Sequence, residues 1–179
     1  MSAAQIGLTA AAAVTVQTTL AWSVGSNVAN LDLPLVVVVL AALSRGPLTG
    51  LWTGTGAGFA QDVLSGGIVG VSGLCKSVVG VAAGMAGERL LVAAAWQRSL
   101  VLVAATLVHA TCFFGTYALI PATTPIGSWR DVGAQALANA LVGVVAIGVA
   151  ENAWRWRRRT RHERVGLAVE RWQRAKHAP

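Results

Sequence analysis

The sequence predicts an all-α integral membrane protein, a polytopic bundle of about six transmembrane helices. The chain has 179 residues, of which 55% are hydrophobic and only 12% are charged. A soluble domain carries roughly a quarter charged residues, so too few polar side chains are present here to cover a water-facing surface. The apolar blocks are rich in Ala, Leu, Val and Gly and show no sustained polar alternation, which indicates helices rather than barrel strands.

Six apolar segments follow one another along the chain. Their approximate bounds are residues 4–22, 31–44, 48–64, 69–85, 100–120 and 132–150. The second has only a short uninterrupted apolar core after Pro34, so it could also be re-entrant or tilted. The turn Ser65-Gly66-Gly67 separates the third segment from the fourth. The predicted organisation is a helical bundle over residues 1–153 and a basic cytoplasmic tail over residues 154–179.

The basic residues predict the orientation of the bundle. Nine of the 14 Lys and Arg residues lie in the tail, between Arg155 and Lys176. With six spans and a cytoplasmic N-terminus, the other cytoplasmic cations are Arg45, Arg89 and Arg98, and the external side receives only Arg130. Positive residues concentrate on the cytoplasmic side of membrane proteins. We therefore expect both chain ends in the cytoplasm, and we interpret the basic tail as a topology signal rather than a nucleic-acid site.

The tail itself has the pattern of a basic amphipathic helix. Val165, Val169 and Trp172 recur at helical spacing among cations that include Arg157, Arg158 and Arg159. Such a helix can dock on an anionic lipid surface, where each cation contributes about 1 kcal/mol. Binding to a cytoplasmic protein is the alternative.

Glycine recurs at every fourth position through the third segment, at Gly46, Gly50, Gly54 and Gly58. A four-residue step keeps these positions near one face of a helix, where the missing side chains allow a neighbouring backbone to approach closely. The fourth segment repeats the pattern, with Gly80 and Gly84 among its small residues. We interpret the strip as a packing face inside the bundle, and a face for a partner protein is the alternative.

Asp62 and Lys76 are the two charges expected within the bilayer, where a charge is costly and normally faces the protein interior or an opposite charge. Both lie close to the turn at residues 65–67, so the long lysine side chain could reach Asp62. A structural ion pair that braces this hairpin is the favoured interpretation. Contact with a partner, or handling of protons or solutes, are the alternatives.

No catalytic or cofactor motif emerges from the sequence. His109 and Cys112 are three residues apart, but two ligands do not make a zinc site, so no metal is predicted. No set of nucleophile and base is apparent, so we do not expect an enzyme. A solute-binding transporter subunit would need several convergent polar groups. The candidates for that rival are sparse: Asp62, Lys76, His109, Tyr117, Gln135 and Asn139.

About 45 residues of the chain contain a set of glycines, an arginine and an aspartate in an arrangement that is typical of a known family. The residues that carry the resemblance are Arg45-Gly46-Pro47-Leu48, Gly50, Gly54, Gly58-Phe59, Gln61-Asp62, Ser65-Gly66 and Gly70. The arginine-glycine entry, the glycine-stepped helix, the aspartate near its end and the following glycine resemble the pattern of the rod shape-determining protein MreD family. Gly73, Lys76-Ser77, Gly80 and Gly84 resemble a variant of the next span in part of that family.

The resemblance implies a non-catalytic scaffold subunit of the cell-elongation machinery, which makes peptidoglycan at the bacterial inner membrane. It implies three partners: MreC, MreB and the RodA–penicillin-binding protein synthase. It also implies a fold similar to the substrate-binding components of energy-coupling-factor transporters. The solute-binding transporter subunit stays the main alternative, because that fold is shared with vitamin-binding membrane proteins.

Overall fold

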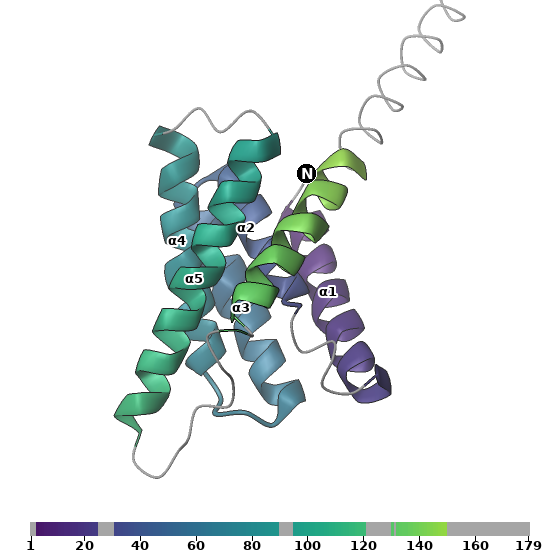
Figure 1. Cartoon of the computed structure of the whole chain (residues 1–179), viewed down its shortest axis with the longest axis vertical. Helices are drawn as coiled ribbons and strands as arrows, with labels where there is room; N and C mark the ends of the chain where they lie inside the picture. Colours follow the sequence, from purple (N-terminus) through teal and green to yellow (C-terminus); the bar gives the residue numbers. More distant parts are fainter. Residues whose placement is uncertain (1–2, 25–30, 90–94, 121–129, 131, 150–179) are drawn as a thin grey trace, which may run out of the picture. The chain divides into compact units, whose positions relative to one another are not determined.

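The computed structural model describes residues 3–24, 31–89, 95–120, 130 and 132–149, and in these residues it contains helices and no strand (Figure 1). The helices are α1 (Ala3–Val24), α2 (Leu33–Arg45), α3 (Pro47–Ser65), α4 (Val71–Arg89), α5 (Ala95–Leu119) and a further helix, Val132–Val149. The all-α prediction is therefore confirmed for the described part of the chain. Each of the six predicted segments coincides with one of these helices.

The chain divides into two compact units, Met1–Val144 and Val145–Pro179. The first unit contains α1 to α5 and most of the helix that begins at Val132. The predicted boundary at residues 153 and 154 lies outside the described residues. So do all the proposed docking residues of the tail, which are Arg157, Arg158, Arg159, Val165, Val169 and Trp172.

Helix α2 is the central helix of the first unit, because its apolar side chains pack on several neighbours. Leu35, Val36, Val39 and Ala42 form a core with residues of α4 and α5. Val38 packs against α1 and α3, where it meets Ala10, Val14 and Ala57. The Val- and Leu-rich run of α2 is apolar almost all round, and this pattern is typical of a helix enclosed by protein.

The start of α2 lies within the protein interior. The helix has 13 residues, so it is about 20 Å long, shorter than a hydrocarbon core of about 30 Å. Asp32 caps its N-terminus and is 2% exposed. Pro34, in the first turn, has no N–H that would need a partner. Protein encloses Asp32 at this helix start, and non-helical backbone is tolerated at membrane depth only where protein or a water-filled cavity surrounds it.

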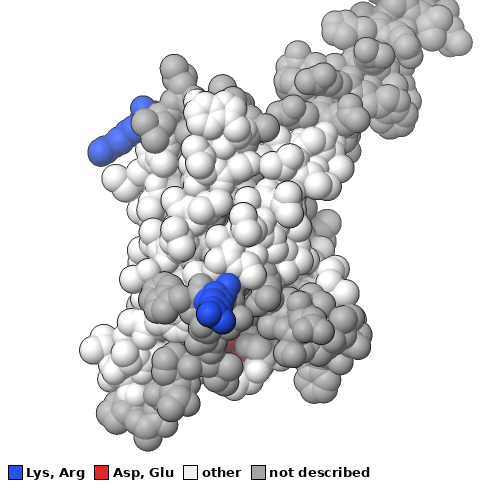
Figure 2. Space-filling model, viewed as in Figure 1, with Lys and Arg blue, Asp and Glu red and all other residues white. Residues whose placement is uncertain are grey.

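Two of the described helices are long and apolar enough to cross a membrane, judged by length and composition: Trp96–Leu119 and Val132–Val149. Helix α2 is apolar but shorter. Figure 2 shows a broad uncharged area on the face drawn, with Lys or Arg above and below it. These features fit a membrane protein, whereas the count of six spans stays a prediction.

Candidate functional site

Helices α3 and α4 form a hairpin whose two backbones touch along a strip of glycines. A Cβ atom on Gly50, Gly54 or Gly58 would come within 3.0 Å of backbone atoms of α4. Their neighbours are the backbones of Gly80, Lys76 and Gly73, respectively. The predicted strip therefore lies at a helix contact inside the chain. Direct backbone packing of this kind is how membrane helices associate without a hydrophobic driving force.

The glycines of α4 mirror this arrangement. A Cβ atom on Gly80 would overlap Gly50, and one on Gly84 would overlap the backbone of Pro47 at the start of α3. Gly46 is needed for a different reason. Its φ of 90° is a backbone conformation that residues with a side chain rarely adopt. It makes the tight link between α2 and α3, with Glu88 beside it.

Lys76 forms an ion pair with Asp32, not with Asp62 as the sequence analysis proposed. Lys76 Nζ lies 2.6 Å from Asp32 Oδ2, and both side chains are almost fully enclosed. The backbone of Lys76 rests on Gly54 of α3, and its side chain reaches the N-terminus of α2. The salt bridge therefore joins α4 to α2 instead of bracing the α3–α4 hairpin.

Asp62 has another set of partners, which explains why it does not pair with Lys76. Its Oδ2 atom accepts hydrogen bonds from the backbone N–H groups of Gly70, at 2.8 Å, and Ser72, at 3.1 Å. These groups lie at the start of α4, where the first N–H groups of a helix have no partner within the helix. Asp62 thus caps α4 from the neighbouring helix, and its negative charge suits the positive end of the helix dipole.

The Asp32–Lys76 pair belongs to a larger group of enclosed side chains, here called the buried polar cluster: Asp32, Lys76, Thr106, His109 and Asn139. Lys76 Nζ lies 3.4 Å from His109 Nε2. Asn139 Oδ1 accepts from the backbone N–H of Asp32 at 2.9 Å. Asn139 Nδ2 donates to Thr106 Oγ1 at 3.0 Å. The cluster therefore connects α2, α4, α5 and the helix Val132–Val149.

Members of the buried polar cluster form hydrogen bonds with one another or with backbone groups of the helix to which they belong. Asp32 Oδ1 accepts from the backbone N–H of Leu35, and Thr106 donates to the carbonyl oxygen of Leu102. Polar groups in a low-dielectric interior are stabilising when they are paired in this way and costly when they are not. The arrangement fits a structural network that fixes how the helices of the first unit pack.

Asp32 and Thr106 are members of the cluster that were not predicted from the sequence. A signal for Asp32 was present, because Asp32-Leu33-Pro34 places a good N-cap residue just before a helix-starting proline. Thr106 carried no such signal. Of the other candidates, His109 is buried and stacks on Phe113, with ring centroids 6.0 Å apart, and Phe113 in turn contacts Tyr117.

Metal ligands do not gather in the described part of the chain. No group of three or more His, Cys, Asp or Glu side chains that could hold an ion is present among these residues. Cys75 and Cys112 are both free thiols.

The outward side of the α3–α4 hairpin carries an apolar groove of about 680 Å³, here called the hairpin groove. It is lined by Leu51, Thr55, Phe59, Gly70, Gly73, Leu74, Ser77, Val78, Val81, Ala82 and Met85. The hydroxyl groups of Thr55 and Ser77 are hydrogen-bonded across it at 2.7 Å. The remaining lining is apolar or glycine, so the groove suits an apolar partner or lipid.

Comparison with known protein families gives a match. The family model of the rod shape-determining protein MreD matches residues 4–141, which is most of the chain. The match includes both helices of the hairpin and all five residues of the buried polar cluster. No curated protein and no solved structure matches the chain. The expected likeness to energy-coupling-factor transporter components therefore stays a prediction. From the extent of the family match, the chain belongs to the MreD family of bacterial membrane proteins that function in rod-shape determination.

Proposed function

We propose that this chain is a non-catalytic scaffold subunit of the bacterial cell-elongation complex, which builds peptidoglycan at the inner membrane. Family membership supports the link to rod shape. The interior supports a scaffold, because its charged and polar groups are used to join helices. A rigid helical body with paired internal charges can hold other membrane proteins without carrying out chemistry of its own.

The observation that carries the proposal is the hairpin groove. It runs from Gly70 to Met85 along α4, a length of about 22 Å that covers most of a hydrocarbon core of about 30 Å. Its lining includes the small residues Gly70 and Ala82, which let a neighbouring helix approach closely, and a Cβ atom on Gly70 would meet nothing within 4 Å. We therefore assign the groove to the single transmembrane helix of a bitopic partner, for which MreC is the family's candidate.

The charge pattern of the chain supports the remaining parts of the complex. The distribution of basic residues supports six spans with both ends in the cytoplasm. With that orientation, the tail over residues 154–179 faces MreB or anionic lipid, and the surfaces of the other helices are left for the RodA–penicillin-binding protein synthase.

The solute-binding alternative has less support from the described residues. Its candidate side chains Lys76, His109 and Asn139 are enclosed and bond to protein groups. None of the three lines the hairpin groove or the groove between α1 and α3.

Site-specific photocrosslinking in living cells tests the scaffold proposal. A photoreactive amino acid at Leu74 or Val78, which are 55% and 48% exposed in the hairpin groove, should give a crosslinked product with MreC. Leu107 and Val108 on α5 are matched controls, because they are 45% and 43% exposed and lie outside that groove. Crosslinks to MreC from the α5 positions, with none from α4, would contradict this assignment.

A further inference from the structure

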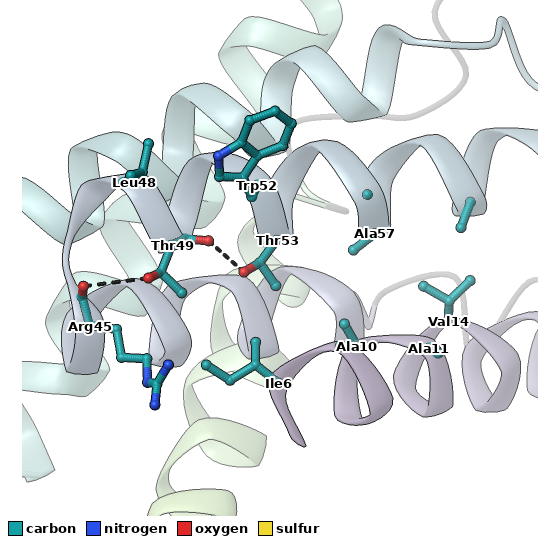
Figure 3. A pocket seen from close by; sticks show the side chains of 13 residues that line it. Ile6, Ala10, Ala11, Val14, Arg45, Leu48, Thr49, Trp52, Thr53 and Ala57 are labelled. Carbon is teal, nitrogen blue, oxygen red and sulfur yellow. Dashed lines mark hydrogen bonds between the residues drawn. The ribbon is translucent and has the colours of Figure 1, made fainter. Parts of the chain in front are cut away.

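A second groove lies between α1 and α3, on a different set of residues from the hairpin groove. It has a volume of about 480 Å³ and is here called the α1–α3 groove. Figure 3 shows side chains of the two helices, such as Ile6 and Thr53, pointing toward one another across it. Small residues open the groove: Gly7 and Gly56 both line it, and a Cβ atom on either would meet nothing within 4 Å.

The walls of the α1–α3 groove are apolar even where the residue type is polar. Thr49 Oγ1 donates to the carbonyl oxygen of Arg45 at 3.4 Å, and Thr53 Oγ1 donates to that of Thr49. Their hydroxyl hydrogens are thus used within the helices, as the dashed lines of Figure 3 show. The groove offers methyl and methylene groups along its length, from Ile6 and Val14 on α1 to Ala60 on α3.

One end of the α1–α3 groove is positively charged. Arg45, the last residue of α2, lines the groove at that end and is exposed. A guanidinium group offers several donors in a fixed planar arrangement that matches phosphate oxygens. The groove therefore combines an apolar channel with a phosphate-binding group at one end, as the chemistry of a phospholipid requires.

The length of the α1–α3 groove and its terminal cation together favour a lipid over a partner helix. Along α3 the groove extends from Leu48 to Ala60, which is about 18 Å, close to one leaflet's share of a hydrocarbon core about 30 Å thick. The hairpin groove is somewhat longer, at about 22 Å, and no charged residue is among those that line it. We propose that the α1–α3 groove binds one anionic phospholipid, with an acyl chain between α1 and α3 and the phosphate at Arg45.

Native mass spectrometry of the purified full-length chain tests this proposal. The chain is titrated in detergent with phosphatidylglycerol and, separately, with phosphatidylcholine of the same acyl chains. We expect one phosphatidylglycerol to be retained in preference to phosphatidylcholine. Arg45→Gln should weaken phosphatidylglycerol about tenfold, as expected for the loss of a charge-assisted hydrogen bond. Gly56→Leu and Gly7→Leu fill the open space, so both should abolish retention of either lipid.

Matched controls separate the groove from the rest of the chain, including the basic tail. Arg89→Gln removes a cation from the end of α4, and Gly115→Leu adds a side chain to α5 where a Cβ atom also meets nothing within 4 Å. Both should retain lipid like the wild type. If the Arg45→Gln variant and one of the two groove-filling variants each retain lipid as the wild type does, the proposal is overturned, because the lipid then binds elsewhere. Dissociation of a dimer or of a protein partner by Gly56→Leu, with lipid still bound, would overturn it as well.

Discussion

At the scale of single residues, the enclosed ion pair between Asp32 and Lys76 joins α2 to α4. Lys76→Ala leaves the Asp32 carboxylate enclosed without its partner, which should destabilise the fold by about 3–5 kcal/mol. Asp32→Ala should have a similar effect for the same reason. The double variant should be less destabilised than the two single losses added together. Thermal melting of the four proteins in detergent measures this coupling.

Asp62 provides the control for that double-mutant cycle. Asp62→Ala removes the acceptor of two backbone N–H groups at the start of α4 and should cost about 0.5–2 kcal/mol, as the loss of a helix cap does. Its effect should add to that of Lys76→Ala to within about 0.5 kcal/mol, because the two side chains serve different partners. Strong coupling between Asp62 and Lys76 would instead restore the pair that the sequence suggested.

At the scale of elements, two glycines of α3 offer a matched comparison. Gly54 touches the backbone of Lys76, whereas Gly56, two positions later, faces open space. Gly54→Ala should separate α3 from α4 and lower the melting temperature. Gly56→Ala should leave the melting temperature unchanged or raise it, since alanine is favoured over glycine in a helix by about 1 kcal/mol. Equal behaviour of the two variants would rule out the glycine contact.

How far the elements could be predicted from the sequence depends on how local each signal is. The glycine strip was predictable because a four-residue step defines one helix face regardless of the partner. The partner of Lys76 was not, because Asp62 is near it in sequence whereas Asp32 is 44 residues away. Choosing between them required knowing that α2 packs beside α4 at the level of Lys76. Only the tertiary arrangement supplies that information.

At the scale of the whole molecule, the distribution of basic residues predicts that both chain ends face the cytoplasm. Single cysteines introduced at Ser2 and at Ala178, in a background in which Cys75 and Cys112 are replaced by serine, test this orientation. Neither should react with an impermeant thiol reagent added to intact spheroplasts, and both should react after lysis. Labelling of one end alone in intact spheroplasts would mean an odd number of spans.

The tail gives a second prediction at this scale. It is rich in arginine and contains little apolar surface from which to build a core. Truncation after Trp156 should therefore leave membrane insertion and melting nearly unchanged, while binding to anionic vesicles falls. The vesicle binding that is lost should be the salt-sensitive part, because the electrostatic screening length falls to about 8 Å near physiological ionic strength. Collapse of the helical body on truncation would show that the tail packs against it.

Because α2 is short and its charge partner lies in α4, the order of synthesis affects how α2 enters the membrane. During synthesis α2 leaves the ribosome well before α4, so Asp32 must enter the membrane while Lys76 is still to come. A 13-residue segment that begins with an unpaired carboxylate is a poor span by itself. We expect α2 to insert stably only when the hairpin arrives. A glycosylation acceptor fused after Arg45, in a chain that stops there, should therefore reach the external side and be modified. An acceptor fused after Arg89 should stay cytoplasmic and unmodified, because α4 then completes the hairpin and α2 is inserted.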